Sequence, residues 1–138
     1  MKIELTIPGP PMGKQRPRVC KFGTYTPAKT VNYETLVKEL YIMQYPQRKP
    51  IDDPLQMTVL AYFPIPKSKS KPVRERMLNN TIKPTIKPDT DNVLKIIADA
   101  LNGLVYVDDK QIVCASVYKF YSDNPRVEVS VTSMNENL

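Results

Sequence analysis

Two pairs of aspartates flank one short helical pattern in this basic chain. Asp89 and Asp91 stand just before the apolar pattern of residues 91–102, and Asp108 and Asp109 follow it. If the next strand starts beside the helix N-terminus, these carboxylates converge and repel one another, and a bound divalent cation removes that conflict. Carboxylate sites suit Mg²⁺ or Mn²⁺, which assist phosphoryl transfer by activating water and neutralising phosphate charge.

Lys95 joins this acidic group through the helical period. Asp91 falls at or near the N-cap of the helix, and Lys95 lies four residues later, so both project from the same side. Asp89 points the same way, because residues in an extended segment alternate faces. A lysine here supplies positive charge near a phosphate or a leaving oxygen. The buried stripe of the helix is predicted to be Val93, Leu94, Ile97, Ala98 and Leu101.

Each of these residues also has a plain structural interpretation. Asp91 can cap the helix, Asp89 and Asp99 can be solvated, and Lys95 can pair with a neighbour. Asp108 and Asp109 can form a turn before the next strand. The combination favours the metal site over these separate roles.

Composition narrows the chemistry that is available. The chain has 138 residues, 41% of them hydrophobic and 25% charged, which fits one domain over residues 1–134 with a frayed tail at 135–138. It contains no histidine, which excludes Ser-His-Asp and Cys-His catalysis and His-ligated zinc. No membrane span or targeting segment is visible, so we expect a cytoplasmic protein, with Cys20 and Cys114 as free thiols in or near the core.

The charge of the chain predicts a polyanionic partner. The net charge is +6 and the pI about 9.3, and nucleic acid is the first candidate. Lys14, Arg16, Arg18 and Lys21 lie in a segment rich in Pro and Gly, and residues 67–88 form a second basic segment. A basic surface that holds phosphates beside an acidic metal pocket is typical of a nuclease.

Two other functions compete with the nuclease. A non-catalytic nucleic-acid-binding module explains the basic charge but not the carboxylates. A phosphatase with a D-x-D nucleophile pair normally places the first Asp directly after an apolar strand, whereas "TIKPTIKP" stands before Asp89 here. The nuclease accounts for both the basic and the acidic residues.

The predicted elements are strands at 2–8 and within 54–66, helices at 30–45 and 91–102, and a C-terminal hairpin of strands 111–121 and 126–133. Apolar residues alternate in the first two strands, which predicts one buried face in each: Ile3, Leu5 and Ile7 in the first, and Leu55, Met57, Val59, Ala61 and Phe63 in the second. Residues 9–29 read as irregular and 67–88 as mostly a long loop. The order β-α-β-α-β-β predicts a single α+β domain, with a mixed sheet and helices packed on one face. Tyr33, Tyr41 and Tyr45 exceed what a small core needs, so their helix and the hairpin are the predicted surfaces for a dimer.

The stretch "PDTDNVLKIIADALNGLVYVDDKQI" closely resembles the signature of the RusA family of Holliday junction resolvases. In that signature D-x-D-N-x-x-K opens a helix, and D-D-x-Q-[IV] follows it. The segments "PGPPMGKQRPR", "TYTP" and "YE" are also similar to this family.

The resemblance implies a homodimeric, Mg²⁺-dependent endonuclease, with Mn²⁺ able to substitute, that resolves four-way DNA junctions by paired nicks in recombination and repair. Such proteins are often encoded by prophages. Asp89, Asp91 and Asp109 match the metal-binding aspartates, and Lys95 matches the essential lysine. Asp108 is a further possible ligand, and Asn92 also matches the motif. Lys14, Arg16, Arg18 and Lys21 are the predicted DNA-binding residues on grounds of charge.

Overall fold

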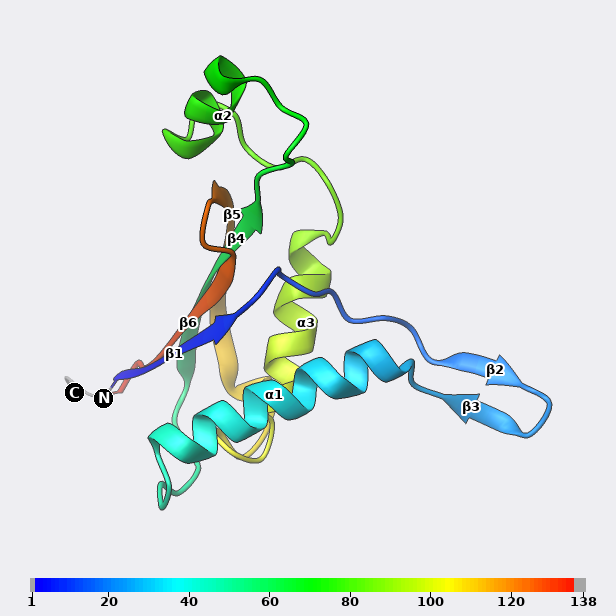
Figure 1. Cartoon of the computed structure of the whole chain (residues 1–138). Coiled ribbons are helices and arrows are strands. Elements are labelled where there is room, and N and C mark those ends of the chain that lie inside the picture. The colour runs from blue at the N-terminus through cyan, green and yellow to red at the C-terminus, as the bar shows by residue number, and fades with distance from the viewer. Residues whose placement is uncertain (1, 136–138) are drawn as a thin grey trace.

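Four strands form the sheet that carries the core of this computed structural model, which describes residues 2–135 (Figure 1). The strands are β1 (Lys2–Pro8), β6 (Arg126–Ser133), β4 (Leu55–Pro64) and β5 (Ile112–Ser122), side by side in that order. β6 runs antiparallel to β1 and to β4, whereas β5 runs parallel to β4. The predicted mixed sheet is therefore confirmed. Of the predicted tail at 135–138, only Asn135 belongs to the described residues.

Two helices, α1 (Ala28–Gln44) and α3 (Thr90–Leu101), cover one face of this sheet (Figure 1). The predicted alternation of β1 and β4 is confirmed, because the side chains that face these helices are all buried: Ile3, Leu5, Ile7, Leu55, Met57, Val59, Ala61 and Phe63. The third helix, α2 (Lys71–Leu78), contacts β5 near the end of the sheet. The chain is one α+β domain, as predicted.

The predicted C-terminal hairpin is wrong. β5 and β6 are joined by residues 123–125, but they do not pair with each other, because β4 lies between them and pairs with both. Crossing the end of β4 spans two strand spacings, about 10 Å, which three linking residues cover easily. The alternation of apolar residues along a strand predicts which face of that strand is buried, but it does not predict which strand pairs with it. The sequence pattern therefore did not indicate that β4 lies between β5 and β6.

The surplus of tyrosines that suggested a dimer surface on α1 is not present. Tyr33 and Tyr41 are only 8% and 2% exposed and belong to the core. The Tyr45 hydroxyl is anchored on β1, where it donates to the Glu4 carbonyl and accepts from the Glu4 N–H, each at 3.2 Å. These tyrosines fill the space between α1 and the sheet and leave no aromatic surplus on this helix.

Two segments predicted as irregular contain regular elements. Residues 9–29 include a small hairpin of β2 (Arg18–Cys20) and β3 (Gly23–Tyr25), in which Gly23 adopts a φ of 128°. Gly tolerates such a left-handed backbone, which the tight turn requires. The segment 67–88 contains the whole of α2, whose first turn holds Pro72 directly after the N-cap region, a common helix-start signal.

Both cysteines are free thiols, as predicted, but both are exposed, so the predicted core placement is wrong. Cys20 lies on β2 and Cys114 on β5, an edge strand of the sheet. Neither position has a second layer above it to bury the thiol. Among residues 2–135, the helices are all too short or too polar to cross a membrane.

Candidate functional site

A hollow of about 290 Å³ lies between α3 and the start of β5. Asp91 and Lys95 line it from α3, and Asp109 lines it from η1 (Asp109–Gln111), the short 3₁₀ turn before β5. Its apolar floor consists of Leu94, Ala98, Ile112 and Ala115. The helical period thus brings Asp91 and Lys95 together, and the turn after the helix brings Asp109 to them.

The carboxylates of Asp89, Asp91 and Asp109 make no hydrogen bond or ion pair within residues 2–135. The N-cap of α3 is Asp89, whose side chain does not bond to the helix, and Asp91 lies near the N-cap, as predicted. Asp91 stands in the first turn, where the positive end of the helix dipole favours a negative charge. These carboxylates therefore have no structural task that would compete with binding a ligand.

Asp89 opens on a different hollow from Asp91. This second hollow is lined by Lys14, Lys29, Lys87 and Asn92 among others. The described residues contain no group of three His, Cys, Asp or Glu side chains placed to hold a metal ion. The predicted convergence of three or four aspartates is therefore not present among the described residues.

The donor set of the first hollow nevertheless fits a hard cation. Mg²⁺ is usually bound by one or two carboxylates, with the remaining positions taken by water and substrate phosphate. Asp91 and Asp109 supply two carboxylates without partners among residues 2–135, and the side chains that line the hollow include no histidine or cysteine.

Asp99 organises the cations around this hollow, a role that the sequence analysis did not predict. Its carboxylate accepts from Lys95 Nζ at 3.1 Å and pairs with Lys14 Nζ at 3.2 Å. Lys14 also pairs with Glu34 on α1 at 2.8 Å. Burial lowers the pKa of Lys14, but the hydrogen bonds to Glu34 and Asp99 outweigh it and raise that pKa. The i, i+4 spacing of Lys95 and Asp99 was the signal in the sequence.

Tyr106 holds the turn that carries Asp109 against α3. Its phenol is fully buried and donates to the Ala98 carbonyl at 2.6 Å. Burial, and then the negative charges of Asp109, Asp99 and Asp108, raise the pKa of this phenol above its usual range. The hydroxyl therefore remains a proton donor to α3 and keeps the acidic turn beside the helix.

Asp108 and Gln111 shape the same turn. Asp108 and Gln111 form a capping box, in which the Gln111 side chain accepts from the Asp108 N–H at 2.8 Å. The Asp108 carboxylate also accepts from the Lys110 N–H at 3.3 Å. The Gln111 amide also donates to the carbonyls of Ile51 and Asp53. The second part of the sequence motif thus contains one free carboxylate, Asp109, and two residues that position it.

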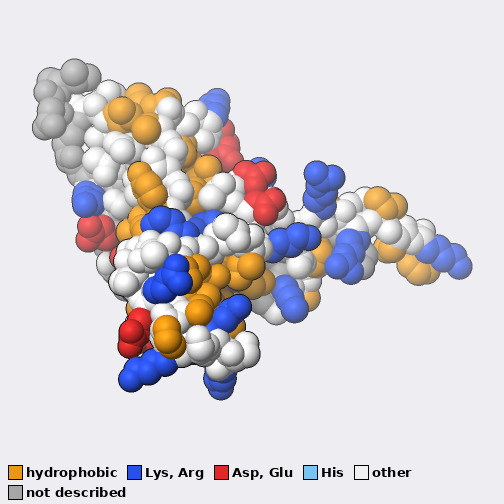
Figure 2. All heavy atoms as spheres, turned by 90° about the horizontal axis from the view of Figure 1, so that it is seen from above, with side chains coloured by type: hydrophobic (Ala, Val, Ile, Leu, Met, Phe, Trp, Pro, Cys, Tyr) orange, Lys and Arg blue, Asp and Glu red, His pale blue; other side chains and the backbone are white. Residues whose placement is uncertain are grey.

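The four predicted DNA-binding residues fall into two groups. Lys14 is partly buried in its ion pairs with Glu34 and Asp99, and its side chain is 22% exposed. Arg16, Arg18 and Lys21 are exposed on a projecting segment, residues 16–27, which we call the arm. Figure 2 shows the arm reaching away from the body with basic and hydrophobic side chains along it.

The arm is fixed to α3 at its root. Gly13 lies so close to this helix that an added Cβ would stand 2.7 Å from Pro88 Cβ and 3.2 Å from Asn92 Cβ. The next residue, Lys14, donates its N–H to the Asn92 carbonyl at 3.0 Å. The Gln15 N–H then bonds to the hydroxyl of Thr30 at 3.3 Å, where α1 begins. The free arm therefore starts beside the residues that line the acidic hollow.

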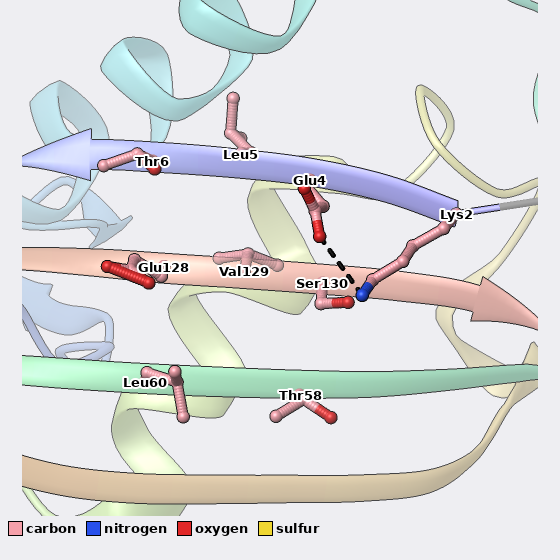
Figure 3. Close-up of a pocket in the computed structure, with 9 residues that line it drawn as sticks. All are labelled: Lys2, Glu4, Leu5, Thr6, Thr58, Leu60, Glu128, Val129 and Ser130. Carbon is pink, nitrogen blue, oxygen red and sulfur yellow. Dashed lines mark ion pairs between the residues drawn. The ribbon is translucent and has the colours of Figure 1, made fainter.

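A further hollow of about 390 Å³ lies on the face of the sheet opposite α1 and α3 (Figure 3). Lys2 and Glu4 line it and pair with each other at 3.1 Å (Figure 3). Glu128, which lies opposite Thr6, pairs with Arg126 at 2.7 Å. Its other polar side chains are threonines and a serine. None of the motif residues reaches it, so it offers no comparable chemistry.

Comparison with known proteins identifies the family of this chain. The family model for the endodeoxyribonuclease RusA matches residues 8–132, which include every element from α1 to β5. The chain is also 39% identical over 139 residues to the uncharacterized protein YqaN of Bacillus subtilis (strain 168), an alignment that covers 96% of this chain and 97% of YqaN. The chain belongs to the endodeoxyribonuclease RusA family.

Proposed function

We propose that this protein is a Mg²⁺-dependent endodeoxyribonuclease that resolves four-way DNA junctions by paired symmetric nicks. The observation that carries the proposal is the hollow in which Asp91 and Asp109, two carboxylates without a partner among the described residues, adjoin Lys95. Family membership implies endodeoxyribonuclease activity. The exposed basic arm beside the hollow supports a nucleic-acid substrate.

In this proposal Asp91 and Asp109 would hold the metal ion, and Asp89, which lines the neighbouring hollow, is proposed as a further ligand on its match to the family motif alone. The ion, when bound, activates water for attack on the phosphodiester and neutralises the phosphate charge. Lys95, held by Asp99 at 3.1 Å, places a positive charge beside the same hollow, where it stabilises the negative charge that develops on the phosphate. Asp108 acts on the turn and not on the metal, because its carboxylate caps η1.

Resolution of a four-way junction needs two nicks in opposed strands. One chain has one acidic hollow, so we propose a homodimer with two-fold symmetry, whose two hollows match the symmetry of the junction. Light scattering on the purified protein should report twice the chain mass of 15.8 kDa at micromolar concentration. A chain that stays monomeric even on junction DNA would contradict paired nicking.

A supercoiled plasmid that extrudes a cruciform tests nicking and pairing together. Two nicks made within the lifetime of one complex convert the plasmid to the linear form. A single nick releases the supercoiling, so the cruciform is reabsorbed and the plasmid becomes a nicked circle that is no longer a substrate. We expect linear product with Mg²⁺ and none with EDTA. Binding of the cruciform without any cutting under either condition would favour the non-catalytic nucleic-acid-binding module.

A further inference from the structure

The tip of the arm exposes two hydrophobic side chains to an unusual degree. Phe22 is 92% and Val19 is 84% exposed. An isolated two-stranded hairpin is at best marginally stable in water, and β2 and β3 pair only with each other among the described residues. A binding partner that covers this tip would stabilise both the hairpin and the side chains.

The charge around the tip indicates what that partner is. Between Glu4 and Glu34 the sequence has no acidic residue, but it has five basic ones: Lys14, Arg16, Arg18, Lys21 and Lys29. Lys21 Nζ lies 5.9 Å from the centre of the Phe22 ring, so a cation and an aromatic ring stand together at the tip. Aromatic rings set among basic side chains are the usual surface for unpaired nucleic-acid bases. A second copy of the same arm would instead meet like charges.

We infer that Phe22 stacks on an unstacked base near the branch point of the DNA, while Arg16, Arg18 and Lys21 contact the flanking phosphates. This inference rests on the proposed function and adds to it a determinant of branch selectivity. A phenyl ring has no hydrogen-bonding group that could read a base edge, but it can stack on any base whose face is free. Continuous duplex offers no such face, and a branch point does.

The length and the anchoring of the arm fit this role. From Arg16 to Phe22 an extended chain reaches about 20 Å, or about six base steps of a DNA strand. The root of the arm is fixed to α3 by the hydrogen bond between Lys14 and Asn92, and Asn92 adjoins Asp91. The tip therefore touches DNA at a limited distance from the phosphate that the acidic hollow cuts.

Replacing Phe22 and the arginines separately tests the two contacts. Phe22→Ala should weaken junction binding about tenfold without changing the salt dependence, because no charge is removed. Arg16→Ala with Arg18→Ala should lower the slope of log affinity against log salt by about two. The matched control is Met43→Ala, which removes an equally bare side chain (78% exposed) from α1 and should bind like the wild type.

The absence of tryptophan from the chain allows a direct readout. Phe22→Trp places a single fluorophore at the tip, and Met43→Trp provides the control. In EDTA, junction DNA should quench the emission of Phe22→Trp much more than continuous duplex does, and the control should not respond.

Four results would overturn the inference. Wild-type junction affinity in Phe22→Ala, or unchanged emission from Phe22→Trp on bound junction, excludes stacking while leaving nuclease activity intact. Emission from Phe22→Trp that changes with protein concentration in the absence of DNA assigns the tip to a second copy of the chain. If the wild-type chain neither binds nor cuts junctions, the proposed function fails, and this inference fails with it.

Discussion

The two ends of α3 carry acidic residues in opposite states. Asp91 in the first turn and Asp109 beside the helix have no partner within residues 2–135, whereas Asp99 near the other end is paired with both Lys14 and Lys95. The first pair is available to a cation, and Asp99 is already neutralised by the protein. The residue type alone therefore does not indicate the role of these aspartates. Whether a carboxylate is paired within the protein indicates whether it is available to a ligand or positions its neighbours.

The largest effect is expected from removing the free carboxylates. Asp91→Asn and Asp109→Asn should each lower the rate of junction cutting by more than about a hundredfold, which exceeds the usual cost of losing an outer-shell partner of a metal. Junction binding should be kept or become tighter, because a negative charge that faces the DNA is lost. Cleavage and gel-shift assays on the same preparations measure both. The control is Asp123→Asn, an exposed position in the turn between β5 and β6; equal loss in all three variants would contradict the assignment.

A smaller effect is expected at Asp99. Asp99→Asn frees Lys95 but leaves the pair of Lys14 with Glu34, so cutting should fall about tenfold, within the cost of misplacing a catalytic group. Glu34→Gln is the matched control, because it removes a partner of Lys14 but none of Lys95. Single-turnover rates decide the outcome. Equal losses in the two variants would show that Asp99 acts through the fold and not through Lys95.

Tyr106 and Tyr33 allow the stability contributions of a hydrogen-bonded and an unbonded buried hydroxyl to be compared. Tyr106→Phe removes a buried hydrogen bond to the Ala98 carbonyl and should cost about 1–2 kcal/mol. The Tyr33 hydroxyl is buried without a hydrogen-bond partner in the described structure, so Tyr33→Phe should be neutral or stabilising. Urea denaturation measures both. A loss of stability in Tyr33→Phe as large as that in Tyr106→Phe would contradict this account.

The smallest expected effect is on the alkaline stability of the protein. Burial raises the pKa of both Tyr33 and Tyr106, so the folded chain keeps protons that the unfolded chain loses above its phenol pKa of about 10. Below that pH both phenols are protonated in the folded and the unfolded chain, so their ionisation does not reduce the free energy of unfolding. Above it, each phenol should lower the free energy of unfolding by up to about 1.4 kcal/mol per pH unit. Denaturation at pH 9 and pH 11 should show a smaller decline for Tyr33→Phe than for the wild type; identical declines would exclude this linkage.

Local periodicity predicted much of this site. The helical period placed Lys95 on the same side as Asp91, and alternation identified the buried residues of β1 and β4. These features depend on residues that are near one another in the chain, and their spacing is visible in the sequence.

The features that sequence could not predict depend on distant partners. The place of β4 between β5 and β6 is decided by the burial of whole strands, and the capture of Lys14 by Asp99 joins residues from separate elements. Asp89 was expected beside Asp91, but the Pro88–Asp89 segment turns toward Gly13 and lines another hollow. The projecting arm was not predicted either, because its residues have the composition of an ordinary loop.

The central claim is that the acidic hollow beside α3 cuts branched DNA with the help of a metal ion. The most direct measurement is the rate at which the wild-type protein cuts a synthetic four-way junction and a continuous duplex of the same sequence, each with Mg²⁺ and with EDTA. The account predicts nicks at symmetric positions in opposed strands of the junction with Mg²⁺, no cutting with EDTA, and far slower cutting of the duplex. Equal cutting of junction and duplex, or cutting that persists in EDTA, would contradict it.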